Sequence, residues 1–201
     1  KSMHKRGYRL SQHDAPIKET LAAAILRMAG YDGSQTFYDP MCGSGTIAIE
    51  AAMLALNKAS LIHRKKGEFG FEHLQDFNPS LWRQIQDEER LAKARELSQP
   101  IFASDINPRY VSDTRDNALR ARVEKFMTFG TGSFFDLPAP ASSGILVANL
   151  PYGERIQTEE QFAEFYKAVG DTLKQKYAGW KAYLLVNEDS PWKAIGLKPS
   201  K

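Results

Sequence analysis

The chain contains a glycine turn, Met41-Cys42-Gly43-Ser44-Gly45, that directly follows Asp39 and Pro40. Gly43 and Gly45 let a ligand approach the backbone closely, and a helix that starts after the turn would present free N–H groups to that ligand. The carboxylate of Asp39 would repel a pyrophosphate, but it suits a ligand with an ammonium or sulfonium group. The turn therefore predicts a binding site for a ligand that carries a positive charge.

The same glycines also fit a dinucleotide site, because Gly43-x-Gly45-x-x-Ala48 matches that fingerprint. Such sites bind the ribose through an acidic residue about 20 residues after the glycines, and residues 60–66 offer no good candidate. A nicotinamide-dependent oxidoreductase is therefore a distant alternative, which cofactor binding would discriminate. The sequence holds no Gly-Lys-Ser/Thr, which excludes a triphosphate-binding P-loop.

Two further polar positions follow apolar runs. Asp105 ends the run Ile101-Phe102-Ala103-Ser104, and its carboxylate could accept both hydroxyls of a ribose or interact with the dipole of the next helix. Asn149-Leu150-Pro151-Tyr152 follows the apolar residues 144–148.

The Asn149 side-chain oxygen and a nearby backbone carbonyl could accept both N–H bonds of an exocyclic amine. Pro151 would stiffen the backbone, and Tyr152 could stack on a flat base. Taken alone, this segment is equally compatible with a turn that ends a strand beside a core tyrosine. Because the segment follows the glycine turn and Asp105 along the chain, we favour the interpretation that it acts on an amine.

These positions lie at the ends of expected parallel strands. Apolar runs predict strands at 36–39, 101–105, 126–129, 144–149 and 182–186. Helices are expected at 46–56, from Asn107-Pro108 onwards and at 159–176. Strands that alternate with helices predict an α/β, doubly wound, mostly parallel sheet, whose ligands bind at the carboxyl ends of the strands.

We divide the chain at residue 36. Residues 1–35 form a lead-in with a helix whose packing stripe is predicted as Ile17, Leu21, Ala24, Ile25 and Met28. Residues 36–201 form the main domain, with an insertion at about 58–99. That insertion holds the basic cluster Arg64-Lys65-Lys66, several phenylalanines and a helix that Asn78 caps.

Composition narrows the class of protein further. The 201 residues are 42% hydrophobic and 25% charged, as in a globular chain, and the net charge of +3 permits an anionic partner without requiring one. A single cysteine, Cys42, excludes an internal disulfide and a cysteine-rich zinc site. The four histidines lack ligand spacing, and no apolar run is long enough to cross a membrane. We expect a cytoplasmic protein that binds no metal.

Together the motifs resemble those of class I amino-methyltransferases that use S-adenosylmethionine. The resemblance rests on Asp39-Pro40-Met41-Cys42-Gly43-Ser44-Gly45-Thr46, Ala103-Ser104-Asp105 and Asn149-Leu150-Pro151-Tyr152-Gly153-Glu154-Arg155. More narrowly, the chain is similar to RNA guanine-N2 methyltransferases of 23S ribosomal RNA, in which a THUMP RNA-binding domain precedes the catalytic domain. Residues 4–9 and 15–20 also resemble the lead-in of that family.

The resemblance implies a Rossmann-like fold and a role for each motif. Asp39 and the segment Pro40, Met41, Cys42, Gly43, Ser44 and Gly45 would face the methionine part of the cofactor. Asp105 would bind its ribose, and Ile106, Ser133 and Phe134 would surround its adenine. Asn149 would also border the cofactor, and Asn149, Leu150, Pro151 and Tyr152 would be catalytic. The antiparallel hairpin that usually closes this sheet has no counterpart before residue 201, so a fragment is suspected.

The implied reaction is methyl transfer to the N2 amine of a guanine in RNA. Leu150 stands where the family usually has proline, and adenine-N6 dimethylases of ribosomal RNA share this leucine, so adenine N6 in RNA or DNA is the alternative target. A catalytically silent RNA-binding module is a second alternative, and its basic contacts would be Lys5, Arg6, Arg9 and Arg64-Lys65-Lys66. Carbon-5 pyrimidine methylation is discounted, because Tyr152 stands where that chemistry needs a cysteine.

Overall fold

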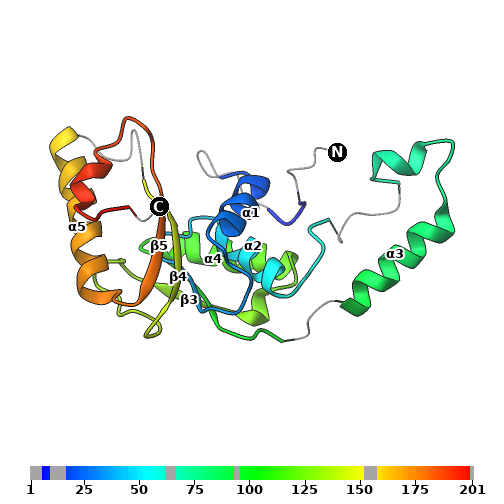
Figure 1. The fold of residues 1–201 in the computed structure, drawn as a ribbon, viewed down its shortest axis with the longest axis horizontal. Helices are drawn as coiled ribbons and strands as arrows, with labels where there is room; N and C mark the ends of the chain where they lie inside the picture. Colours follow the sequence, from blue (N-terminus) through cyan, green and yellow to red (C-terminus); the bar gives the residue numbers. More distant parts are fainter. Residues whose placement is uncertain (1–5, 10–16, 62–66, 93–95, 152–157, 200–201) are drawn as a thin grey trace.

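A computed structural model describes residues 6–9, 17–61, 67–92, 96–151 and 158–199. Its centre is a five-stranded sheet, all of whose strand pairs are parallel (Figure 1). The strands lie in the order β3-β2-β1-β4-β5. Their bounds are Phe37–Asp39 (β1), Ile101–Asp105 (β2), Met127–Thr131 (β3), Gly144–Asn149 (β4) and Trp180–Leu185 (β5). The predicted doubly wound sheet is confirmed, and within the described residues no antiparallel strand joins it.

The direction in which the chain builds the sheet reverses at β1. From β1 the chain adds β2 and then β3 on one side, and it returns to add β4 and β5 on the other. Asp39, the last residue of β1, pairs with Ala103 of β2, while Tyr38 pairs with Leu146 of β4. In a sheet of this kind the ligand crevice opens outside the carboxyl ends of the strands at the reversal. All three predicted motifs follow β1, β2 or β4.

Helices cover both faces of the sheet. Their bounds are Glu19–Met28 (α1), Thr46–Ala55 (α2), Pro79–Ala92 (α3), Pro108–Arg120 (α4) and Glu159–Lys176 (α5), with short 3-10 helices at Gly70–His73 (η1), Glu124–Phe126 (η2) and Trp192–Ile195 (η4). Figure 1 shows α5 on one side of the sheet and α1, α2 and α4 on the other. No helix among the described residues has the length and apolar character to cross a membrane.

The alternation of side chains along β4 produces the two layers of the core. Ile145 and Val147 pack in the cluster that α1, α2 and α4 cover, whereas Leu146 and Ala148 pack in the cluster that α5 covers. A strand that is buried on both faces is expected to be apolar throughout. Burial on both faces therefore explains the apolar run from which the sequence predicted β4.

The predicted packing stripe of α1 was only partly right, since Ile17 and Ile25 pack against the core as partly buried side chains. Leu21 and Met28 are 49% and 85% exposed, and the buried face consists of Glu19, Ala22 and Leu26. Glu19 is drawn to this face because its carboxylate lies 3.9 Å from the Arg9 guanidinium. The buried alanine and leucine belong to the core that α1 shares with α2. Because of this shared core, the domain boundary that we drew at residue 36 stays an interpretation.

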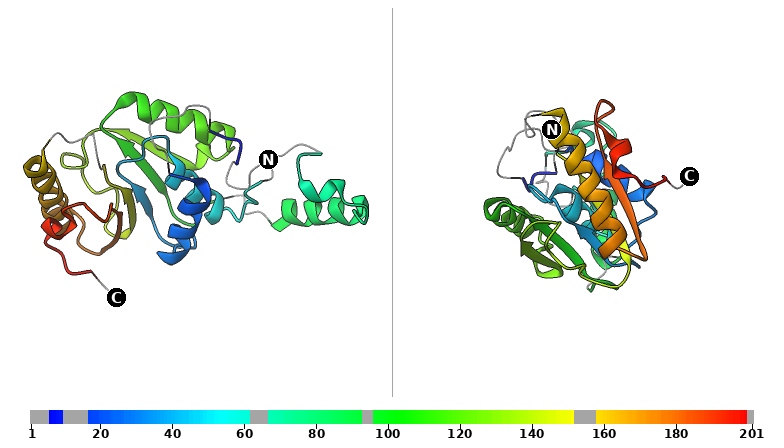
Figure 2. Two further views of the ribbon diagram at one scale, coloured as in Figure 1. Left: turned by 90° about the horizontal axis from the view of Figure 1, so that it is seen from above. Right: turned by 90° about the vertical axis from the view of Figure 1, so that its left-hand side faces the viewer.

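The expected insertion contains an arm that projects from the main body, as Figures 1 and 2 show from different sides. Its rings pack on one another at centroid distances of 4.9–5.9 Å; they belong to Phe69, Phe71, Phe77 and Trp82. Asn78 caps α3 as predicted, since its side-chain oxygen accepts hydrogen bonds from two backbone N–H groups. The basic cluster 64–66 lies outside the described residues.

Candidate functional site

A cavity of about 280 Å³ opens at the carboxyl ends of β1, β2 and β4. Its lining includes twelve of the residues that the sequence singled out: Asp39, Pro40, Met41, Cys42, Gly43, Ser44, Asp105, Ile106, Ser133, Phe134, Asn149 and Pro151. Six further residues complete the described lining: Ile17, Thr46, Ile47, Tyr110, Phe135 and Phe165. The structure thus brings the three motifs, which are well separated along the chain, into one site.

The glycine turn adopts a backbone that only glycine takes without strain at two positions. The φ angles of Gly43 and Gly45 are +54° and +81°. A Cβ on Gly43 would have no neighbour within 4 Å, so the missing side chain leaves open space beside the cavity. A Cβ on Gly45 would lie 2.4 Å from Thr114 Cγ2. Gly43 therefore offers room for a ligand, whereas Gly45 lets the turn pack on α4.

Asp39 is a buried acidic residue of the site, with only 1% of its surface exposed. Burial raises the pKa of its carboxyl group to about 8, and the nearby Asp105 adds to the rise. Among the described residues that line the cavity, none is lysine, arginine or histidine. A ligand that brings a positive charge to Asp39 would supply a cationic partner and favour its ionised form.

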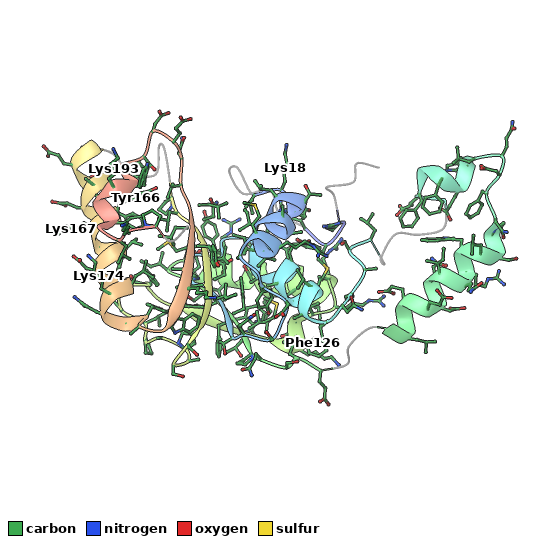
Figure 3. The ribbon with its side chains drawn as sticks, viewed as in Figure 1. Lys18, Phe126, Tyr166, Lys167, Lys174 and Lys193 are labelled. Carbon is green, nitrogen blue, oxygen red and sulfur yellow. The ribbon has the colours of Figure 1, made fainter. Side chains whose placement is uncertain are left out.

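Basic side chains lie on or next to the helices rather than in the described lining of the cavity. Figure 3 labels four of them: Lys18 just before α1, Lys167 and Lys174 on α5, and Lys193 on η4. The charged residues of the described cavity lining, Asp39 and Asp105, are both acidic, although the net charge of the chain is positive. In the part of the chain that the structure describes, no group of histidine, cysteine or acidic side chains could hold a metal ion.

Asp105 connects β2 to the glycine turn. One carboxylate oxygen accepts a hydrogen bond from the Gly43 N–H at 3.0 Å, and the other accepts one from the Asn107 N–H at 2.9 Å. Each carboxylate oxygen can accept more than one hydrogen bond. Asp105 therefore supports the turn and retains acceptor capacity for hydroxyl groups of a ligand.

Apolar side chains form another part of the cavity lining. Phe134 is 4% exposed, and the ring of Phe135 meets that of Phe165 edge to face at 5.6 Å. Ile106 is 71% exposed, and its side chain is therefore available for contact with a ligand. Flat aromatic ligands bind well between such groups. The predicted pair Ser133 and Phe134 does border the cavity.

The segment after β4 is placed in part. Asn149 and Pro151 line the cavity. Leu150 does not: its side chain is 1% exposed in the core, and its N–H donates to the Leu185 carbonyl at 3.1 Å. That bond holds the backbone against β5 and so fixes where Asn149 ends the strand. Tyr152 lies outside the described residues.

Several supporting contacts of the site were not predicted, and Arg9, which was expected only as a basic contact for RNA, makes two of them. The Arg9 guanidinium donates to the Thr46 hydroxyl at 2.7 Å and to the Ile17 carbonyl at 2.8 Å, and both of these residues border the cavity. Thr114 and Asn117 on α4 donate to carbonyls of the glycine turn. No local pattern announces such contacts, because each joins segments that are distant in sequence. Gly45 was singled out, but it packs behind the turn and does not line the cavity.

Comparison with known proteins agrees with this geometry. The family model described as "RMKL-like, methyltransferase domain" matches residues 6–201. The chain is 41% identical to the ribosomal RNA large subunit methyltransferase K/L of Vibrio campbellii over 99% of its own length, but it covers only 29% of that protein. It therefore spans less than a third of this relative.

Solved structures show the same fold. The protein SMU.472, solved in complex with SAH, superposes with a TM-score of 0.88 at 31% identity, over 98% of this chain and 51% of that one. A protein of Listeria monocytogenes described as a predicted N6-adenine-specific DNA methylase gives 0.85 at 34% identity, with the same coverage. These matches favour the methyltransferase interpretation over the nicotinamide-dependent alternative. The chain belongs to the family of RMKL-like methyltransferase domains.

Proposed function

We propose that the cavity binds S-adenosylmethionine and that the chain transfers the methyl group to an exocyclic amine of a base in large-subunit ribosomal RNA. The observation that carries the proposal is the composition of the cavity. It joins a buried carboxylate, an open glycine backbone and an aromatic wall to an asparagine at the end of β4. Family membership supports the reaction class.

The lining fits the parts of this cofactor in turn. Asp39 suits its positively charged methionine end, and Gly43 leaves room for close approach of that end to the backbone. Asp105 has acceptor capacity for the ribose hydroxyls. The wall that contains Phe134 and Ile106 suits the adenine ring. SMU.472, with its bound SAH, supports the same assignment by similarity.

When bound, S-adenosylmethionine supplies an electrophilic methyl group on a sulfonium sulfur. Asn149 would accept one N–H of the target amine through its side-chain oxygen, and the Leu150 carbonyl would accept the other. These bonds would leave the nitrogen lone pair directed at the methyl group. The new nitrogen–carbon bond would replace the methyl–sulfur bond and leave S-adenosylhomocysteine, and the proton that the amine loses would pass to solvent. Pro151 would keep this backbone rigid, and Tyr152 would clamp the base. The chain thus contributes position and electrostatics.

Guanine N2 is the target that we propose first, on the resemblance to guanine-N2 methyltransferases and the similarity to the K/L enzymes. Adenine N6 is the second candidate, because Leu150 matches adenine-N6 enzymes and the Listeria monocytogenes relative is described as adenine-specific. Either base must leave its stack, which costs a few kcal/mol in a duplex. RNA is the proposed partner, and a THUMP domain is the proposed RNA-binding neighbour in a longer protein. Such an enzyme would act in the cytoplasm.

Substitution of Asn149 tests the proposed chemistry. Asn149→Ala should abolish methyl transfer to unmodified ribosomal RNA while it leaves the affinity for S-adenosylhomocysteine within a few-fold of wild type. Asn149→Asp, which keeps an acceptor oxygen, should retain part of the activity. A fully active Asn149→Ala variant would remove this side chain from the mechanism. A wild-type protein that binds the cofactor and RNA but transfers no methyl would support the silent-module alternative.

A further inference from the structure

The glycine turn is held from behind by two side chains of α4. The Thr114 hydroxyl donates to the Gly43 carbonyl at 2.8 Å, and the Asn117 amide donates to the Ser44 carbonyl at 2.9 Å. Thr114 and Asn117 are 0% and 1% exposed, and neither lines the cavity. Two consecutive carbonyls of the turn are thus tied to one rigid helix, which lies far from the turn along the chain.

Cys42 extends this arrangement. Its sulfur lies 3.4 Å from the Thr114 hydroxyl oxygen. The single proton of that hydroxyl is directed at the Gly43 carbonyl, which can only accept. The thiol must therefore be the donor to Thr114. Burial raises the pKa of the Cys42 thiol well above its usual range, which keeps the proton in place. The chain of donors runs from Cys42 through Thr114 to Gly43.

The opposite side of the turn is held by β2. Asp105 accepts the Gly43 N–H, and the Ser104 carbonyl accepts the Cys42 N–H at 2.9 Å. The peptide groups around Gly43 are therefore fixed by α4 through a carbonyl and by β2 through N–H groups. The methyl group of Thr114 also fills the space where a Cβ of Gly45 would stand. These contacts leave the turn little freedom to change its φ angles.

We infer that Thr114 and Asn117 are positioning residues for the cofactor, which hold the glycine turn in its binding conformation before the cofactor arrives. The inference rests on the proposed function for the identity of the ligand. A turn that is already ordered loses less conformational entropy on binding, and the affinity is correspondingly higher. Loss of either donor should loosen the turn and weaken binding without a change to any group that lines the cavity.

Thr114→Val is the first test, because valine keeps the shape of threonine and removes only the hydroxyl. Thr114→Ser restores the hydroxyl, and Thr172→Val is the matched control at a buried threonine of α5 that is 7% exposed. Two readouts are measured: the Kd for S-adenosylhomocysteine by calorimetry, and amide hydrogen exchange of residues 43–45 in the cofactor-free protein by NMR. Urea unfolding verifies that each variant is folded.

Thr114→Val should raise the Kd about tenfold, equivalent to about 1.4 kcal/mol, and should accelerate exchange in the turn by a similar factor. Thr114→Ser should stay within about threefold of wild type in both readouts, given the modest worth of one methyl contact. Thr172→Val should change neither the Kd nor the exchange of residues 43–45. A folded Thr114→Val variant with wild-type affinity and wild-type exchange would overturn the inference.

Asn117→Ala provides an independent variant if Thr114→Val does not fold, and the same two readouts decide. Failure of the proposed function would look different. In that case the wild-type protein would bind no S-adenosylhomocysteine, while faster exchange of residues 43–45 in Thr114→Val than in Thr172→Val would still show that α4 positions the turn. Unchanged exchange in both α4 variants would refute the positioning role whatever the ligand.

Discussion

Replacement of Asp39 by asparagine should stabilise the cofactor-free chain and weaken cofactor binding at the same time. The substitution keeps the size of the side chain and removes its charge. Burial raises the pKa of Asp39 from 3.8 to about 8 in the folded chain. Between these two values the folded state binds a proton that the unfolded state does not, so the stability of the wild-type chain falls as the pH rises.

The size of the effect follows from the two pKa values. One pKa unit corresponds to about 1.4 kcal/mol, so Asp39 costs the folded chain about 4 kcal/mol at pH 7. From pH 5 to pH 8 this cost grows by about 4 kcal/mol. The neutral amide of the Asp39→Asn variant carries no such cost. The difference in the free energy of unfolding between Asp39→Asn and wild type should therefore widen by that amount across this range.

Urea unfolding from pH 5 to pH 8 measures this difference, and the comparison cancels the titration of groups that both proteins share. Asp76→Asn, at an exposed aspartate of the projecting arm, is the control and should show no such widening. Calorimetry at pH 8, where about half of Asp39 is ionised in the free protein, should show about tenfold weaker S-adenosylhomocysteine binding by Asp39→Asn. A charged hydrogen bond contributes about 1.5–3 kcal/mol, and ionising Asp39 at this pH removes only about 0.4 kcal/mol of that. A difference that is constant with pH, or an unchanged affinity, would refute the reasoning.

Three further predictions concern other parts of the chain. In urea unfolding, Gly45→Ala should lower the free energy of unfolding by about 2 kcal/mol more than Gly67→Ala does. The φ angles of these glycines, +81° and +82°, are nearly the same, but only a side chain on Gly45 would collide with α4. Equal losses in the two variants would contradict this prediction. Arg6→Ala should lower the free energy of unfolding by about 3 kcal/mol, because the buried Glu50 carboxylate loses the ion-pair partner that lies 3.2 Å away. Adding Glu50→Gln should recover most of this free energy in the same assay. Cys42, 8% exposed with its pKa raised by burial, should react with iodoacetamide at pH 8 only when urea unfolds the chain; rapid labelling of the native protein would contradict its placement.

The sequence predicted the sheet and the convergence of the three motifs at one edge of it, because both depend on short-range patterns. A strand such as β4, which is buried on both faces, must be a continuous apolar run, and the carboxyl ends of parallel strands must meet at one edge. The sequence therefore predicts that three residues lie together: Asp39, Asp105 and Asn149. The structure places all three on one cavity.

The residues that were missed depend on tertiary contacts. The buried face of α1 includes Glu19, whose carboxylate lies 3.9 Å from the Arg9 guanidinium, and the helical periodicity of apolar residues could not reveal this pairing. Thr114 and Asn117 are polar residues in a helix of mixed composition, and their role appears only when α4 is packed behind the turn. Side-chain partners so far apart in the sequence leave no local signal. Tyr152 lies outside the described residues, so its role as a clamp stays a prediction.

Transfer of a labelled methyl group from S-adenosylmethionine to unmodified large-subunit ribosomal RNA, followed by nucleoside analysis, tests the central claim most directly. We predict label in N2-methylguanosine, and label in N6-methyladenosine would instead assign the adenine target. The account would be contradicted by folded wild-type protein that neither binds S-adenosylmethionine nor transfers its methyl group. The same test applies to a longer chain that carries the proposed RNA-binding domain.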